Sequence, residues 1–153
     1  MKAKKYLSQL SGIDAKIVQK EEEAESIRST LEAKGIRYDK EKVTSSPKNM
    51  QEESICKLVD VENAIQKDIV KFVQKRDKII NQIQQLDDSR YVQILYLHYV
   101  PIQHKTMRLE EIACKLKKNN GDSYSYDHIS RLHGIALCNF EKKFQNNMEM
   151  PNN

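Results

Sequence analysis

Two long stretches, residues 2–34 and 51–87, repeat apolar side chains at alternating spacings of three and four residues and contain no proline. The first holds a single glycine, Gly12, and the second holds none. Such spacing lines up apolar side chains along one side of an α-helix and is typical of helices that pair in coiled coils. The pattern therefore predicts two long helices, the second roughly 55 Å long at about 1.5 Å per residue.

The apolar positions of the two stretches match in an antiparallel hairpin. The heptad positions of the first stretch are Ala3, Tyr6, Leu10, Ile13, Ile17, Lys20, Ala24, Ile27 and Leu31. Those of the second are Leu58, Glu62, Ile65, Ile69, Phe72, Arg76, Ile79, Ile83 and Leu86. The charged Lys20, Glu62 and Arg76 interrupt this otherwise apolar seam. This register places Ile17 beside Phe72 and Leu10 beside Ile79. A slip of one heptad, or pairing of the same positions between two chains, satisfies most of the same pattern. We expect Gly35 to end the first helix and a polar loop to occupy about residues 35–50.

Composition favours an all-α, soluble protein. Apolar residues make up 39% of the 153 residues and charged residues 31%, with only four glycines and three prolines. No apolar stretch is long enough to cross a membrane, and Asp14 and Lys16 interrupt any apolar block of a signal peptide, so we expect a cytoplasmic protein. The three cysteines form no CxxC pair, and we expect buried, reduced thiols. The run of acidic residues at 21–25 is interpreted as a solvated helix face.

The pattern shortens after Asp87 and Asp88, where either Asp88 or Ser89 can cap a new helix. The segment RYVQILYLHYV reads as a compact helix ended by Pro101, LEEIACKL as a second short helix, and residues 126–144 as a third. The sequence therefore predicts a hairpin arm at 1–88, a helical domain at 89–146 and a disordered tail at 147–153.

The last two of these helices show the pattern of a helix-turn-helix. The face expected to point inward comprises Leu109, Ile112, Ala113 and Leu116 in one helix, and Ile129, Leu132, Ala136, Leu137 and Phe140 in the other. Ser125 is placed to cap the last helix, and Tyr124 has the spacing to pack on Ile129.

The stretch from Tyr91 to Phe144 resembles region 4 of sigma factors, which reads the −35 promoter element. ILYLHYV, LEEIA and YSYDHISRLHGIAL resemble more closely the small sigma-like regulators of phages and prophages in Gram-positive bacteria. The resemblance implies that the last helix enters the major groove of DNA. The side chains expected at base edges are Tyr126, Asp127, Ser130 and Arg131. Those expected at phosphates are Lys105, Arg108, Lys117 and Lys118.

One departure from region 4 concerns the turn. Seven residues, KKNNGDS, separate Leu116 from Tyr124, where region 4 has a tight connection. We expect the first helix to continue through Lys117 and Lys118, with Gly121 turning the chain, which either shifts the last helix or lengthens the turn into a wing-like loop.

The patterns indicate a helical DNA-binding candidate, and the resemblance implies a sequence-specific transcriptional regulator of phage or prophage type, in the cytoplasm of a bacterial host. Its expected partners are double-stranded DNA, host RNA polymerase and a second copy paired through the arm. Two alternatives stay open: a DNA-packaging protein like a small terminase subunit, and a coiled-coil interaction protein without DNA binding. No catalytic motif is present and no cofactor is expected. His128 and His133, five residues apart, point about 140° away from each other on a helix, which disfavours a shared metal ion.

Overall fold

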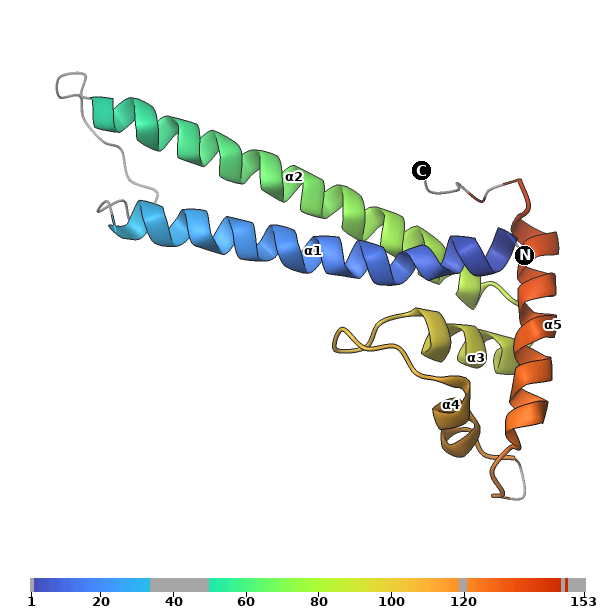
Figure 1. The fold of residues 1–153 in the computed structure, drawn as a ribbon. Helices are drawn as coiled ribbons and strands as arrows, with labels where there is room; N and C mark the ends of the chain where they lie inside the picture. Colours follow the sequence, from blue (N-terminus) through green and yellow to red (C-terminus); the bar gives the residue numbers. More distant parts are fainter. Residues whose placement is uncertain (1, 34–49, 119–120, 147, 149–153) are drawn as a thin grey trace. The chain divides into compact units, whose positions relative to one another are not determined.

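The computed structural model describes residues 2–33, 50–118, 121–146 and 148. Within these ranges it is all-α, as the composition predicts, and contains no strand (Figure 1). No described helix combines the length and apolar character needed to cross a membrane. The helices are α1 (Lys2–Ala33), α2 (Met50–Gln84), α3 (Ser89–Tyr99), α4 (Leu109–Lys115) and α5 (Tyr126–Phe144).

The helix boundaries follow from local chemistry. The long α2 ends at Gln84, three residues earlier than expected, and Asp88 then caps α3 by accepting a hydrogen bond from the Arg90 backbone N–H at 2.8 Å. The Arg90 guanidinium also donates to Asp88 at 2.7 Å, and these bonds hold the pKa of that carboxyl below its usual value. The expected stop at Gly35, its loop up to residue 49, and the tail at 147–153 apart from residue 148 lie outside the described residues.

The chain forms two compact units. Unit 1 comprises residues 1–15 and 74–153, and unit 2 comprises residues 16–73, so that α1 and α2 each contribute to both. The functional division expected at residue 88 stays a prediction.

Unit 2 consists of antiparallel segments of α1 and α2. Arg28 donates to Glu62 at 2.6 Å, and the Lys16 ammonium lies 5.7 Å from the centre of the Phe72 ring. Glu62 is only 4% exposed, and this partner compensates its burial. The contact at Phe72 comes from the residue next to its expected neighbour Ile17; the register stays a prediction.

Unit 1 brings the start of α1 and the end of α2 together with α5, which the sequence did not indicate. The Tyr6 hydroxyl donates to Gln82 at 2.8 Å, and the Tyr6 ring lies 6.1 Å from that of Phe140. The backbone N–H of Ala3 donates to Glu141 at 3.1 Å. These contacts bury the carboxyl-terminal half of α5 and leave its amino-terminal half to the smaller helices.

The smaller helices α3, α4 and α5 share an apolar cluster. Its buried members are Ile94, Ile112, Ala113, Ile129 and Leu132, with Tyr91, Leu97, Met107, Leu109, Leu116 and Tyr124 packed around them. The inward side chains expected for α5 are all buried. Tyr124 contacts this cluster, which contains its expected neighbour Ile129. The cluster fixes one face of α5 inward and its opposite face outward.

Candidate nucleic-acid interface

The amino-terminal end of α5 is capped by Ser125, whose hydroxyl oxygen accepts a hydrogen bond from the His128 backbone N–H at 3.3 Å. The Tyr124 ring stacks on His128, with centroids 5.2 Å apart. The cap and the stacked pair hold the first turn in place. The start of α5 is therefore a defined helix end rather than a frayed one.

Side chains expected to reach bases lie around this first turn and the next. Asp127 and Arg131, four residues apart, are exposed on one ridge, and Tyr126 beside them is 48% exposed. Ser130 is half-buried at the edge of the ridge. Among the described residues, the side chains of Tyr126, Asp127 and Arg131 have no hydrogen-bond or ion-pair partner. Their polar groups can therefore meet a ligand without breaking an internal contact.

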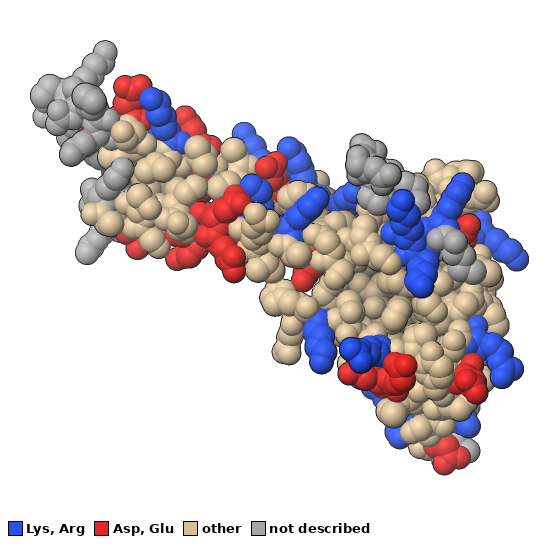
Figure 2. Space-filling model, viewed as in Figure 1, with Lys and Arg blue, Asp and Glu red and all other residues tan. Residues whose placement is uncertain are grey.

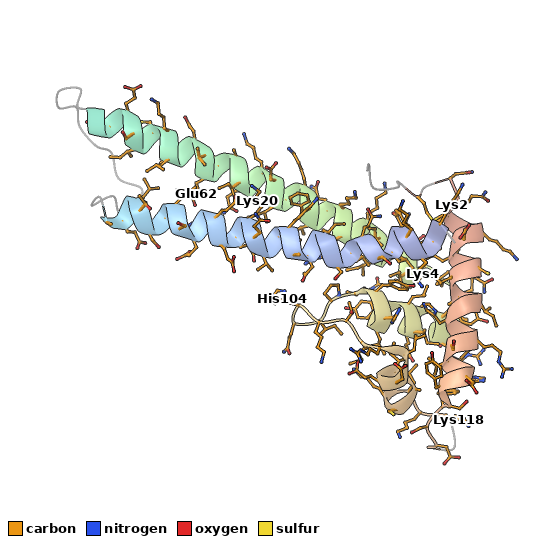
Figure 3. All side chains as sticks on the ribbon, in the orientation of Figure 1. Lys2, Lys4, Lys20, Glu62, His104 and Lys118 are labelled. Carbon is orange, nitrogen blue, oxygen red and sulfur yellow. The ribbon has the colours of Figure 1, made fainter. Side chains whose placement is uncertain are left out.

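Three of the four basic residues expected at phosphates come from α4 and its connection to α5. Lys117 donates to the Ser123 hydroxyl at 2.7 Å, and the Lys118 ammonium lies 5.8 Å from the centre of the Tyr124 ring. Both lysines are exposed, and Figure 3 shows Lys118 at the amino-terminal end of α5. Arg108 precedes α4 and is exposed, while its backbone N–H donates to Glu111. The structure thus places Lys117 and Lys118 beside the α5 start.

Lys105 is not brought to this end of α5. It closes a tight turn in which Ile102 and Lys105 exchange two backbone hydrogen bonds, at 2.9 and 3.1 Å. The turn residues Gln103 and His104 have φ of 51° and 64°, and the His104 Nδ1 lies 3.0 Å from the Asp14 carboxylate on α1. Figure 3 shows His104 and Lys118 at separate places in unit 1. Lys105 therefore belongs to another part of the surface.

The connection between α4 and α5 is a turn of its own. Because α4 ends at Lys115, the expected continuation of this helix through Lys117 and Lys118 is wrong. Instead Lys117 and Ser123 form an isolated bridge, and the Lys118 N–H donates to the Asp122 carbonyl at 2.8 Å. Gly121 turns the chain, as predicted, with a φ of 86° that glycine adopts without strain.

The two histidines of α5 lie in different environments. His128 is exposed, whereas His133 is half-buried and its Nε2 lies 3.0 Å from the Tyr99 hydroxyl. Burial, the neighbouring His98 ring and the Lys4 charge lower the pKa of His133 to about 4, and burial raises the pKa of Tyr99 to about 12. His133 is therefore a neutral packing residue at pH 7. No cluster of three metal-binding side chains occurs in the described ranges.

The outer ridge of α5 extends beyond the residues that the sequence singled out. Ile135, four residues after Arg131, is 45% exposed, and Gly134 faces open space. Cys138 is also exposed, as are Cys56 and Cys114, so the expectation of buried thiols is wrong. Helical spacing could have predicted that Cys138 is exposed, because it lies seven residues, or about two turns, after Arg131 on the same face of the helix.

Charge on the molecule is unevenly distributed between elements. The segment 89–153 carries nine Lys and Arg against six Asp and Glu. In Figure 2 lysines and arginines stand out over unit 1, and carboxylates gather along the middle of α1. A weak positive surplus is permissive of nucleic-acid binding.

Comparison of the chain with protein-family models, curated proteins and solved structures finds no match.

Proposed function

We propose that the protein binds double-stranded DNA sequence-specifically through α5 and regulates transcription, as a phage or prophage regulator does. The observation that carries the proposal is the capped start of α5, where exposed Asp127 and Arg131 share a ridge while Ile129 and Leu132 anchor the opposite face. An α-helix presented in this way fits the width of the major groove.

In this proposal some side chains near the α5 start contact bases and others contact phosphates. Arg131 donates two hydrogen bonds to a guanine, and Asp127 accepts one from a cytosine amino group. Lys117 and Lys118 hold adjacent phosphates, together with Arg108. Tyr126 contacts a phosphate or a thymine methyl group. The resemblance of residues 91–144 to sigma region 4 favours promoter-proximal sites and contact with RNA polymerase.

Selection of bound DNA from a random library tests the proposal. The wild-type protein should enrich a defined motif, and Arg131→Ala should relax one position of it at a cost of about 1–3 kcal/mol. The salt concentration must be the same for both proteins, because phosphate contacts make affinity salt-dependent.

Lys142→Ala is the matched control, since Lys142 is an exposed cation on the same helix, about 16 Å further along. It should leave the motif unchanged. Enrichment of no motif by the wild type, with residual binding lost on adding salt, would overturn the proposal and favour an interaction protein. Ring-shaped assemblies would favour the DNA-packaging alternative.

A further inference from the structure

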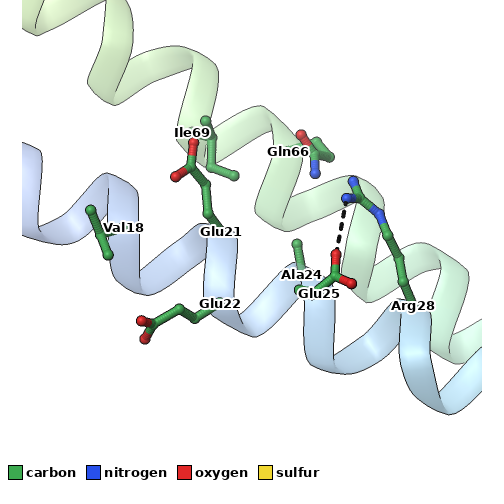
Figure 4. Close-up of a pocket in the computed structure, with 8 residues that line it drawn as sticks. All are labelled: Val18, Glu21, Glu22, Ala24, Glu25, Arg28, Gln66 and Ile69. Atoms are coloured by element: carbon green, nitrogen blue, oxygen red, sulfur yellow. Dashed lines mark ion pairs between the residues drawn. The ribbon is translucent and has the colours of Figure 1, made fainter.

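A pocket lies between α1 and α2 within unit 2 (Figure 4). Its floor is apolar, formed by Val18, Ala24 and Ile69. On the α1 side it is lined by Glu21, Glu22 and Glu25, with Arg28 at one end, and Gln66 lies on the α2 side. In Figure 4 the Glu21 side chain points toward α2 and the Glu22 side chain points away from it. Glu21, Glu22 and Glu25 are exposed, as expected for a solvated helix face, and the pocket adds an apolar lining beside them.

The α2 wall of this pocket continues as an apolar stripe. Val59, Gln66, Val70 and Val73 follow one another at spacings of seven, four and three residues, which places them on one side of the helix. Val70 is 53% exposed, and Val59 and Val73 are half-buried. On α2 the pocket itself is lined by Gln66 and Ile69, and the valines adjoin it on the Gln66 side of the helix. We call the pocket and these adjoining valines together the unit 2 groove.

The negative charge of the unit 2 groove is not neutralised locally. Arg28 lies 2.6 Å from Glu62 and 3.7 Å from Glu25, so its charge is shared between two carboxylates. Glu21 and Glu22 form no ion pair with another described residue. The segments 16–33 and 50–73 carry six Lys and Arg against ten Asp and Glu. The surrounding field therefore favours a cationic occupant.

We propose that the unit 2 groove is a docking site for a basic amphipathic helix of a partner protein. The apolar face of that helix packs on the floor and the α2 valines, and its Lys or Arg side chains pair with the α1 carboxylates. A helix laid in such a groove uses apolar anchors at helical spacing for affinity, and charge for orientation and partner choice.

A second copy of this chain is a less suitable occupant. Unit 2 itself carries the acidic surplus, with ten Asp and Glu against six Lys and Arg in segments 16–33 and 50–73. The groove would therefore meet another acidic surface in a pairing of unit 2 with itself. Like charges across an interface oppose association.

Binding of a synthetic helix to the full chain tests the proposal. The probe is a labelled peptide of about 18 residues, built from Leu and Lys with the two types on opposite faces, and its Leu and Glu counterpart serves as the negative control. The basic peptide should bind with a micromolar dissociation constant, measured by fluorescence anisotropy, and the acidic peptide should not bind.

Val70→Asp separates groove binding from simple charge attraction. If only charge mattered, the added carboxylate would strengthen binding of the basic peptide; if the valine wall contributes, binding should weaken by about tenfold or more. Val61→Asp makes the same change at a 48% exposed valine on the other side of α2 and should not weaken binding. Equal effects of the two variants would overturn the proposal.

Reversal of the acidic wall tests the second half of the groove. Glu21→Lys with Glu22→Lys should weaken the peptide by about tenfold or more and remove most of the salt dependence. Glu52→Lys with Glu53→Lys, the same change at the start of α2, should have a much smaller effect. If the free wild-type chain is instead a dimer that Val70→Asp dissociates and Val61→Asp does not, the occupant is a second copy and the partner helix is rejected.

Discussion

At the residue scale, the buried contact between His133 and Tyr99 makes stability depend on pH. The pKa of His133 is lowered to about 4 in the folded chain, from an ordinary value of 6.5, so the unfolded chain binds the extra proton more readily between these values. Stability contributed by neutral His133 is fully present above pH 6.5 and is lost as the pH falls towards 4. Because the ring is only half-buried, we expect a loss of about 1–2 kcal/mol rather than the larger value implied by an unscreened shift.

Urea denaturation at pH 7 and pH 5 measures this loss. His133→Gln keeps an acceptor for the Tyr99 hydroxyl but cannot take up a proton, so its free energy of unfolding should change less between the two pH values. The matched control, His128→Gln, alters the exposed histidine on the same helix and should keep the wild-type pH dependence. A wild-type slope in His133→Gln would show that another group is responsible.

At the element scale, three glycines in different backbone conformations should respond differently to alanine. Gly12 and Gly134 lie inside α1 and α5 with open space where a Cβ would stand, so Gly12→Ala and Gly134→Ala should each stabilise the protein by about 0.5–1 kcal/mol. Gly121 has a φ of 86°, so Gly121→Ala should destabilise it by about 1 kcal/mol or more. Thermal denaturation of the three variants measures the two expected gains and the one expected loss in stability. A gain in Gly121→Ala would contradict this account.

Local sequence rules predicted the helices better than the tertiary contacts between them. Asp88 and Pro101 mark the ends of α3 and Ser125 the start of α5, because each acts on the backbone within a few residues, whereas α4 ends earlier than predicted. The burial of Phe140 against Tyr6 was not predictable, since no local pattern joins the two ends of the chain. The unit 2 groove was missed for a related reason: its acidic wall and its valine wall come from helices far apart in sequence, and each alone resembles an ordinary helix surface.

At the scale of the whole molecule, the two units differ in how much apolar surface they bury. Among the described residues, the buried apolar side chains of unit 2 are only Ile17, Ala24, Leu31 and Ile65, whereas all the others belong to unit 1. Leu58, Ile69 and Phe72 are half-buried and so bury less apolar surface each. Two helices that pack only on each other leave the sides of their contact open to solvent. The two units should therefore open with different free energies.

Hydrogen–deuterium exchange of the full chain measures this difference. Backbone amides of residues 16–33 and 50–73 should exchange faster than those in the middle of α3 and α5, since local opening of unit 2 exposes little apolar surface. The basic Leu and Lys peptide, if it occupies the unit 2 groove, should slow exchange there and leave α5 unchanged, because a ligand stabilises only the state that binds it. Equal protection of both units in the free protein would mean that unit 2 is already covered. Dilution then decides the reason, since protection by a second copy falls with protein concentration whereas the intrinsic stability of the arm does not.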